Sequence, residues 1–350
     1  MVIVTKPKAS AEEITAIETR IINEGLQPHK IVGEALVIIG VIGTPSEDFR
    51  EQMAVFPGVE RVVRIGKPYT MAGRGDSRSD TTIEIKGTSI GGGDGVTIMA
   101  GPCTIENRDQ LMSTADTVKL HGATILRGGA WKPRTSPYSF QGMKEEGLKL
   151  LQEAGLRTGL PTITEVMEPD LVEKVAQYTD ILQIGARNSQ NFALLREAGA
   201  SGIPVMVKRG PGATVEEWIM SAEYVMAEGN PNVMLCERGI KTFEPSTRNS
   251  LDINGIAMAK RLSHLPVICD PSHATGKWYL VEPATLAGIA AGADGVIIEV
   301  HPTPDHALCD GPQSLTFGNF ENLAKKISDI ATAVGRPVKD LADTKPPISQ

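Results

Sequence analysis

The stretch GGAWKPRTSPYSFQG, residues 128–142, places Lys132 and Arg134 on either side of Pro133 and contains no acidic residue to neutralise them. A guanidinium group binds phosphate or carboxylate through two parallel hydrogen bonds, and an ammonium group supplies a compact charge. The segment is therefore typical of a site that holds anions. The chain carries a net charge of −7, so an anion site must be built from a local cluster of this kind.

Four more cationic residues follow apolar, β-branched runs of the sequence. They are Arg127, Arg187, Lys208 and Arg238. Any one of them has an ordinary explanation as an exposed charge or as the partner of a helix carboxylate. Together with Lys132 and Arg134 they form a recurring pattern, and this recurrence favours one site for more than one anion.

A second group of residues has the chemistry of metal ligands. It consists of Cys103, His273, Glu299 and Asp310. A thiol, an imidazole and two carboxylates suit a divalent transition metal. No local spacing motif links these four residues. Cys103 also has an ordinary explanation as a small buried residue, and His273 as a loop residue. His301, two residues past Glu299, is a competing ligand. Cys309, next to Asp310, is another.

The composition limits the class of protein. The 350 residues are 41% hydrophobic and 22% charged, which is typical of a globular chain too long for one small domain. No apolar run is long enough to span a membrane, and the first residues lack the pattern of a secretory signal. The four cysteines form no CxxC pair, so free thiols are expected. We therefore expect a cytoplasmic protein with neither membrane nor nucleic acid as a partner.

Two kinds of element alternate from residue 96 onward. Continuous apolar runs predict eight buried strands, at 96–100, 123–127, 158–164, 181–185, 204–208, 233–237, 266–270 and 295–300. A helical stretch follows each, at 108–121, 142–154, 168–177, 191–198, 214–228, 251–262, 282–291 and 319–334. Eight such units over about 250 residues indicate a (β/α)8 TIM barrel. An open doubly wound sheet is the alternative, although it usually has fewer units and often carries a GxGxxG turn.

The chain divides into four parts. Residues 1–66 predict the order βαββαβ, which is typical of a small ferredoxin-like α+β domain. Residues 67–95 are rich in Gly, Ser, Arg and Asp and contain one alternating stretch, TTIEIKGTSI, which predicts a short hairpin within a linker. The barrel takes residues 96–338, and residues 339–350 form a C-terminal tail.

The chemistry of a TIM barrel lies at the C-terminal ends of its strands. Nearly every predicted strand ends on or just before a polar residue, and Glu165 and Asp270 join the groups above at these ends. A barrel without a site would carry apolar residues and ordinary turn residues there. The pattern over eight ends therefore indicates an active site.

Seven motifs carry a resemblance to a known family. They are AGPCTIEN, RGGAWKPRTSP, GARN, VKRG, CERG, CDPSHATGK and IIEVHP, in this order. Together they resemble the 3-deoxy-D-arabino-heptulosonate 7-phosphate (DAHP) synthases, in the type I beta branch with an N-terminal ferredoxin-like, ACT-like regulatory domain. The resemblance covers essentially the whole chain. It implies condensation of phosphoenolpyruvate with erythrose 4-phosphate and water, the first step of the shikimate pathway of aromatic amino acid biosynthesis.

The resemblance also implies a role for each residue of the site. It assigns phosphoenolpyruvate to Arg127, Lys132, Arg187, Lys208 and Arg238. It assigns the phosphate of erythrose 4-phosphate to Arg134 and Thr135. It assigns a divalent metal ion (Mn, Fe, Co or Zn) to Cys103, His273, Glu299 and Asp310. In that arrangement His301 and Cys309 are not ligands. The resemblance further implies a homotetramer that is inhibited by tyrosine or phenylalanine.

The expected reaction suggests which residues move protons. After C3 of phosphoenolpyruvate attacks the aldehyde, water adds at C2 and phosphate leaves; Glu165 and Lys208 are the candidates for handling that water. Lys132 is the candidate acid for the new hydroxyl, since an ammonium among neighbouring cations should give up its proton more readily than a free one. Asp270 orients His273, holds a substrate hydroxyl, or is only a turn residue.

Three other functions are alternatives. 3-Deoxy-D-manno-octulosonate 8-phosphate synthase uses the same chemistry on arabinose 5-phosphate, but there an Ala-Asn-Arg run follows the lysine, whereas this chain has Pro133, Arg134 and Thr135. A non-catalytic barrel that senses amino acids would not need an intact set of ligands and anion-binding residues. A metal-dependent aldolase for another substrate would not need so many phosphate contacts.

Overall fold

The computed structural model describes residues 1–33, 36–63, 68–75, 78–93, 95–134 and 136–339. The chain forms two compact units, Met1–Pro68 and Tyr69–Gln350. Each unit has its own buried hydrophobic core, as an independent domain does.

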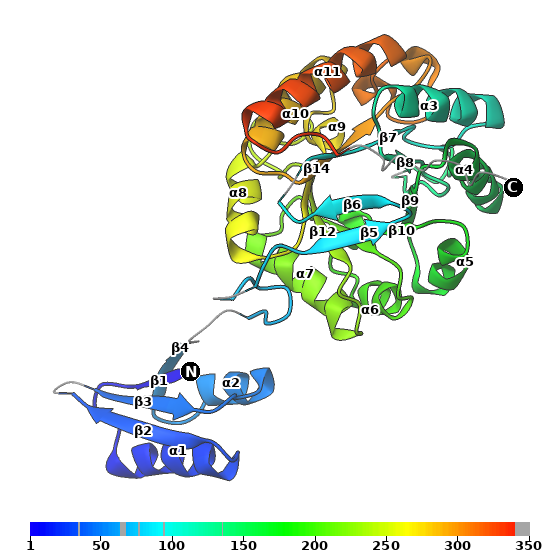
Figure 1. Cartoon of the computed structure of the whole chain (residues 1–350). Coiled ribbons are helices and arrows are strands. Elements are labelled where there is room, and N and C mark those ends of the chain that lie inside the picture. The colour runs from blue at the N-terminus through cyan, green and yellow to red at the C-terminus, as the bar shows by residue number, and fades with distance from the viewer. Residues whose placement is uncertain (34–35, 64–67, 76–77, 94, 135, 340–350) are drawn as a thin grey trace, which may run out of the picture. The chain divides into compact units, whose positions relative to one another are not determined.

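The first unit is a four-stranded antiparallel sheet with two helices packed against it (Figure 1). Its elements are β1 (Val2–Thr5), α1 (Ala11–Asn23), β2 (Gln27–Val32), β3 (Val37–Ile42), α2 (Glu47–Ala54) and β4 (Val59–Val63), and the strand order is β2-β3-β1-β4. Ile3 and Ile39 of the sheet are buried together with Ile17 of α1 and Phe49 of α2. The predicted ferredoxin-like arrangement is confirmed.

The second unit is a closed barrel of eight parallel strands with helices around it (Figure 1). The strands are β7 (Thr97–Gly101), β8 (Ile125–Arg127), β9 (Thr162–Val166), β10 (Ile181–Ile184), β11 (Val205–Lys208), β12 (Val233–Glu237), β13 (Val267–Cys269) and β14 (Gly295–Glu299). The helices are α3 (Arg108–Leu120), α4 (Glu145–Thr158), α5 (Val172–Ala176), α6 (Phe192–Ala200), α7 (Val215–Ala227), α8 (Ile253–Leu262), α9 (Pro271–Thr275), α10 (Trp278–Ala290) and α11 (Phe317–Ala333). The predicted (β/α)8 barrel is confirmed.

The boundary between α4 and β9 differs from its prediction. The sequence predicted a strand from residue 158, whereas α4 runs to Thr158 and β9 begins at Thr162. The hydroxyl of Thr158 donates to the carbonyl of Ala154 at 2.7 Å and so finds its partner within the helix. Gly159 then takes the left-handed conformation, with φ 72°, that commonly ends a helix.

The short helix α9 was not predicted from the sequence. It begins directly after β13, where the side chain of Asp270 caps it by accepting the backbone N–H of His273 at 3.0 Å. Pro271 occupies the first helical position, where its missing N–H has no cost. The helix places His273 next to the end of the strand.

A hairpin covers the N-terminal end of the barrel. Strands β5 (Thr82–Ile85) and β6 (Thr88–Gly91) pair in antiparallel register, with Gly87 in the turn as predicted. Ile83 and Ile90 are fully buried against residues that open the barrel strands, among them Ile125 and Ile181. Figure 1 shows the hairpin lying across the opening of the barrel. The hairpin therefore closes the N-terminal end of the barrel, opposite the C-terminal strand ends where the active site is expected.

The segment predicted as a linker, 67–95, belongs to the barrel unit from Tyr69 onward. Glu223 of α7 accepts hydrogen bonds from three successive backbone amides, at 2.8, 2.8 and 2.6 Å. They belong to Thr70, Met71 and Ala72. The chain is thus tied to the barrel almost from the first residue of the second unit.

The end of the described chain also joins the barrel. Lys339 donates its backbone N–H to the carbonyl of Val96 at 3.0 Å. The rest of the predicted tail, 340–350, lies outside the described residues. Within the described part of the chain, no helix has the length and apolar character that crossing a membrane requires.

Candidate active site

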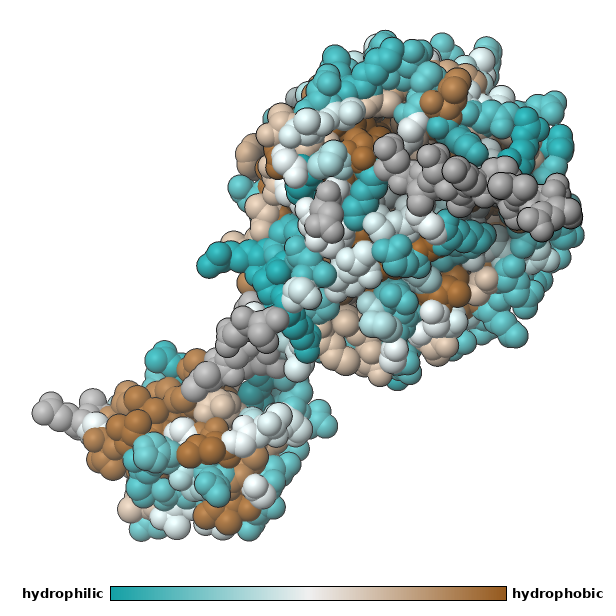
Figure 2. All heavy atoms as spheres, viewed as in Figure 1, coloured by the Kyte–Doolittle hydropathy of each residue, from teal (hydrophilic) through white to brown (hydrophobic). Residues whose placement is uncertain are grey.

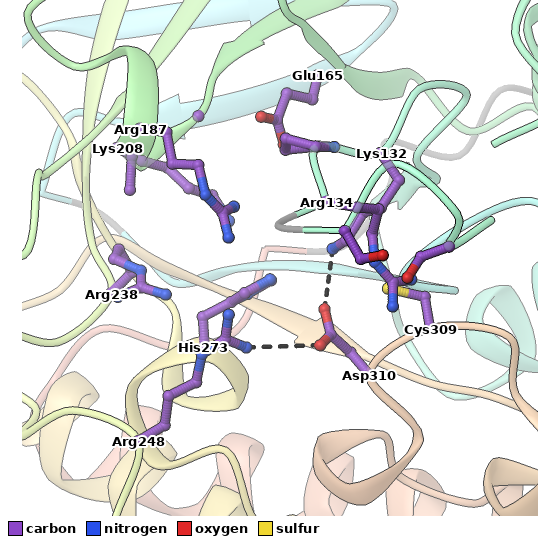
Figure 3. A pocket seen from close by; sticks show the side chains of 15 residues that line it. Lys132, Arg134, Glu165, Arg187, Lys208, Arg238, Arg248, His273, Cys309 and Asp310 are labelled. Carbon is purple, nitrogen blue, oxygen red and sulfur yellow. Dashed lines mark ion pairs between the residues drawn. The ribbon is translucent and has the colours of Figure 1, made fainter. Parts of the chain in front are cut away.

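A cavity of about 330 Å³ lies at the C-terminal ends of the barrel strands (Figure 3). Its lining is dominated by charged side chains. The cations are Lys132, Arg134, Arg187, Lys208, Arg238 and Arg248. Glu165, His273 and Asp310 line the same cavity. The fold therefore brings together residues that the sequence placed at the ends of different strands.

Five of the six cations predicted for the site line this cavity, and Arg127 does not. Arg127 is 6% exposed and donates from Nη1 to Oε1 of Glu299 and to the carbonyl of Pro102, both at 2.9 Å. Thr135, the other predicted phosphate contact, lies outside the described residues.

Arg248 is a lining residue that sequence reasoning missed. It lies in the long loop between β12 and α8, well past the end of the strand. Its Nη1 is 3.5 Å from Oδ1 of Asp310 and donates to Oε1 of Gln313 at 3.0 Å. Gln313 in turn donates to Oε2 of Glu299 at 2.6 Å. The only signal for Arg248 in the sequence was an arginine in a loop that starts at a predicted strand end.

Asp270 joins two parts of the site. Its Oδ2 lies 2.6 Å from Nζ of Lys208 and 2.8 Å from Nδ1 of His273. Burial alone would raise the pKa of Asp270, but His273 and Lys208 outweigh burial and hold that pKa well below its usual range. Among the roles left open by the sequence, this geometry supports orientation of His273. It also adds a role as the counter-charge of Lys208.

Two groups of donor atoms have the proximity of a metal site. One group is His273, Glu299 and Asp310, and the other is Cys103, Cys309 and Asp310; the donor atoms within each group lie within 4.8 Å of one another. The four predicted ligands all belong to these groups, and Asp310 belongs to both. Cys309 lies with them. His301 belongs to neither group, and its Nε2 lies 3.5 Å from a carboxylate oxygen of Glu106 instead.

Lys132 is surrounded by metal-ligand groups. Its Nζ lies 2.9 Å from Sγ of Cys103 and 2.9 Å from Oδ2 of Asp310, and the latter ion pair is dashed in Figure 3. Burial lowers the pKa of Lys132, but the Cys103 sulfur and the carboxylates of Glu299 and Asp310 outweigh burial and raise that pKa well above its usual value. The expectation of easy proton loss is therefore wrong, because the nearest charged neighbour of Lys132 is the carboxylate of Asp310 rather than another cation.

The donor set fits a divalent transition metal. Imidazole and thiolate are preferred ligands of such ions, and carboxylates balance their charge. Burial would raise the pKa of Asp310, but Lys132 and His273 hold it well below its usual range, so this carboxylate is ionised at neutral pH. Cys103 and Glu299 are 3% and 1% exposed, so the site excludes most water.

Glu165 faces the cavity from β9. Gln183 of β10 donates to its Oε2 at 3.1 Å and orients the carboxylate. A side chain at position 185 would place its Cβ 2.0 Å from Oε1 of Glu165. Only glycine at this position leaves room for the carboxylate, and this explains the glycine that begins the GARN motif.

The chain matches known families over nearly its whole length. Residues 79–336 match the DAHP synthetase I family, and residues 1–67 match the DAHP synthase ferredoxin-like domain. The phospho-2-dehydro-3-deoxyheptonate aldolase of Thermotoga maritima is 45% identical over 335 residues, which cover 96% of this chain and 99% of that protein.

Solved and more distant relatives agree with these matches. A crystal structure of the DAHP synthase from Thermotoga maritima superposes with a TM-score of 0.92 at 44% identity, covering 97% of this chain and 98% of that one. A 2-dehydro-3-deoxyphosphooctonate aldolase of Desulfatibacillum aliphaticivorans is 35% identical over 70% of this chain and 95% of its own length. The heptonate enzyme thus matches both units, and the octonate enzyme matches a smaller part of the chain.

Replacement of Asp270 by Asn should lower the free energy of unfolding by about 3–5 kcal/mol, because the buried ammonium of Lys208 loses its counter-charge. Urea unfolding at pH 7, followed by tryptophan fluorescence, measures the change, since Trp131, Trp218 and Trp278 all lie in the barrel unit. The folded-state pKa of Asp270 is lowered, so this stabilisation is present at neutral pH and is lost as the pH falls through that pKa.

The double variant Asp270→Asn with Lys208→Met is the matched control for this experiment. It removes both charges of the pair and should recover most of the lost stability. If the double variant were no more stable than Asp270→Asn alone, the ion pair would not be the cause.

Proposed function

Since the chain belongs to the DAHP synthetase I family, we propose a division of its cavity between the two anionic substrates of that family's reaction. The enzyme condenses phosphoenolpyruvate with erythrose 4-phosphate and water to give DAHP and phosphate, the first step of the shikimate pathway. One observation carries the proposal: a cavity lined by six cations also exposes His273 and Asp310, whose donor atoms group with those of Glu299 and Cys103 beside the cavity.

Phosphoenolpyruvate occupies the side of the cavity formed by the neighbouring strands β10 to β12. Arg187, Lys208 and Arg238 come from the ends of these strands and lie together in Figure 3. Asp270 holds Lys208 in place. Arg127 does not line the cavity, but its buried Nε has no hydrogen-bond partner among the described residues. A buried N–H requires an acceptor, and the substrate carboxylate is the acceptor that we assign to it.

Erythrose 4-phosphate occupies the opposite side, where Figure 3 shows Lys132 and Arg134. Pro133 favours an extended backbone between the two, so that neighbouring cations serve different anions. Arg134 stands nearer the mouth and donates to the carbonyl of Leu308 at 3.4 Å. Arg134 and Thr135 hold the phosphate of this substrate, and Lys132 reaches inward to phosphoenolpyruvate.

The metal ion belongs with Cys103, His273, Glu299 and Asp310, and manganese, iron, cobalt and zinc all suit this donor set. When bound, a divalent ion supplies Lewis-acid polarisation of the aldehyde oxygen of erythrose 4-phosphate. Asp270 supports this site through Nδ1 of His273, which leaves Nε2 facing Glu299 at 3.4 Å. Arg127 fixes Glu299 in the same way at its Oε1.

Two side chains move the protons of the reaction. C3 of phosphoenolpyruvate attacks the aldehyde carbon, and the aldehyde oxygen takes a proton from Lys132. The raised pKa of Lys132 keeps its ammonium protonated until the developing negative charge on the aldehyde oxygen takes the proton. Glu165, oriented by Gln183, takes a proton from the water that adds at C2. Lys208 holds the phosphate that departs as its bond to C2 breaks.

Turnover should require a divalent transition metal. We expect chelation to abolish the loss of enol absorbance in a mixture of phosphoenolpyruvate and erythrose 4-phosphate, and added metal to restore it. Cys103→Ser should bind metal far more weakly, because a neutral hydroxyl replaces a soft anionic ligand. His301→Asn is the control, since His301 lies outside both donor groups, and its metal affinity should match that of the wild type. Full activity after removal of all metal would contradict the assignment.

The two cations around Pro133 should differ in steady-state kinetics. Arg134→Ala should chiefly raise KM for erythrose 4-phosphate, because it removes a phosphate contact from substrate and transition state alike. Lys132→Ala should also lower kcat, by on the order of 100-fold or more, since it removes the proton donor. Arg134→Lys is the conservative control and should lie between the wild type and Arg134→Ala. Equal effects of both alanine variants, confined to KM for phosphoenolpyruvate, would refute the division.

The first unit supplies none of the residues that line the cavity, and all of those residues lie in the barrel unit. We assign to it the binding of an aromatic amino acid, tyrosine or phenylalanine, that inhibits the enzyme from a distance. The match of residues 1–67 to the ferredoxin-like domain of DAHP synthases supports this role. Such inhibition requires that the effector bind one arrangement of the enzyme better than another. We expect the assembly to be a homotetramer.

A chain that begins at Tyr69 should retain activity and lose inhibition. This start keeps the amides that Glu223 binds and removes the first unit. Titration of tyrosine, phenylalanine and tryptophan against the full-length and shortened enzymes measures the difference, with sedimentation to compare their subunit numbers. Unchanged inhibition of the shortened enzyme would place the effector site in the barrel. If none of the three amino acids inhibits the full-length enzyme, the first unit has another role.

A further inference from the structure

A second thiol lies beside the metal-ligand groups and has no role in the proposed reaction. Cys309 precedes Asp310 in the chain, and its sulfur lies within 4.8 Å of the Cys103 sulfur and of a carboxylate oxygen of Asp310. Both cysteines are nearly buried, at 3% exposure for Cys103 and 5% for Cys309. Figure 3 shows the Cys309 sulfur on the side of the cavity that carries Lys132 and Asp310.

The backbone at Asp310 explains how two successive side chains reach one site. In an extended chain, neighbouring side chains point to opposite sides. Asp310 instead has φ 51° and ψ 30°, a left-handed conformation that costs a residue other than glycine on the order of 1 kcal/mol. The turn directs Cys309 and Asp310 toward the same donor group. A strained conformation at this position is consistent with a functional constraint on both side chains.

The two donor groups prefer different metals. Nitrogen and oxygen donors from His273, Glu299 and Asp310 suit hard and borderline ions, whereas the two sulfurs suit soft ones. In a tetrahedral site with metal–sulfur bonds of about 2.3 Å, two sulfurs lie about 3.8 Å apart. The sulfurs of Cys103 and Cys309 lie within 4.8 Å of each other, so a small movement lets both bind one ion.

We propose that a strongly thiophilic divalent cation such as Cd²⁺ binds this chain through both sulfurs, Cys103 and Cys309, together with Asp310. A hard ion such as Mn²⁺ uses one sulfur with His273, Glu299 and Asp310. The inference rests on the metal site of the proposed function. Each sulfur that binds gives up its thiol proton to solvent, so the two-sulfur mode releases one proton more than the one-sulfur mode.

X-ray absorption at the cadmium edge of the full-length wild-type protein, loaded with one Cd²⁺ per chain, counts the sulfur neighbours directly. We expect two. In Cys309→Ser the count should fall to one, and the affinity for Cd²⁺ should fall by on the order of 100-fold, while the affinity for Mn²⁺, followed by electron paramagnetic resonance, should change little. A single sulfur neighbour in the wild type, or two in Cys309→Ser, would overturn the inference.

Cys103→Ser is the matched comparison, since it also leaves one sulfur. It should lower the sulfur count in the same way but weaken Mn²⁺ binding as well, because Cys103 serves in both modes. The two measurements separate the claims. Failure of Mn²⁺ to bind the wild type would undermine the metal site of the proposed function, whereas the cadmium sulfur count alone decides the role of Cys309. The wild-type count needs no variant, so the test does not depend on the folding of either serine variant.

Discussion

Buried positive charge is the constraint on which the active end of this barrel depends. A cavity for two phosphorylated substrates needs cations that are largely removed from water, and burying such a cation costs free energy that a neighbouring carboxylate offsets. The structure supplies a carboxylate for three of the buried cations: Arg127 pairs with Glu299, Lys132 with Asp310, and Lys208 with Asp270. Glu299 and Asp310 are also metal-ligand groups. The sites for anions and for a cation are therefore one electrostatic network, and occupancy of either changes the charge that the other must balance.

The same constraint extends behind the cavity. Arg209 donates to Glu237 at 2.9 Å and to Asp252 at 2.8 Å, and Glu237 is fully buried. Arg209 follows Lys208 directly in the chain, and Glu237 directly precedes Arg238. The Arg209–Glu237 ion pair therefore ties β11 to β12 at the point where each strand presents its cation to the cavity. Neither Arg209 nor Glu237 lines the cavity, but each is bonded to a residue that does.

The two ends of the barrel have different roles: apolar packing at the N-terminal end stabilises the fold, and the C-terminal end carries the reactive groups. At the N-terminal end, the hairpin of β5 and β6 buries Ile83 and Ile90 against the apolar residues that start the strands. At the C-terminal end, charged groups replace apolar ones and line a cavity (Figure 3). Figure 2 shows the opposite face of the barrel, on the side of the hairpin, where hydrophilic and hydrophobic residues are interspersed. Since apolar packing at one end does not depend on the polar network at the other, the ends of the strands are free to carry groups that would weaken a core.

The sequence by itself determined the two folds and most of the groups in the site. Buried parallel strands are continuous apolar runs and the helices between them are amphipathic, so the sequence alone predicted the eight units. Because these strands run parallel, their polar ends had to meet at one end of the barrel, which predicted that residues as distant as Lys132 and His273 share a site. Only the tertiary structure decided which charges pair. Asp270 bonds to Lys208, Arg127 turns to Glu299, and Lys132 lies among anions rather than cations. Loop paths and side-chain rotamers set these partners, and neither follows from periodicity. For the same reason Arg248, far along a loop, and Cys309, turned inward by the left-handed backbone of Asp310, joined the site only in three dimensions.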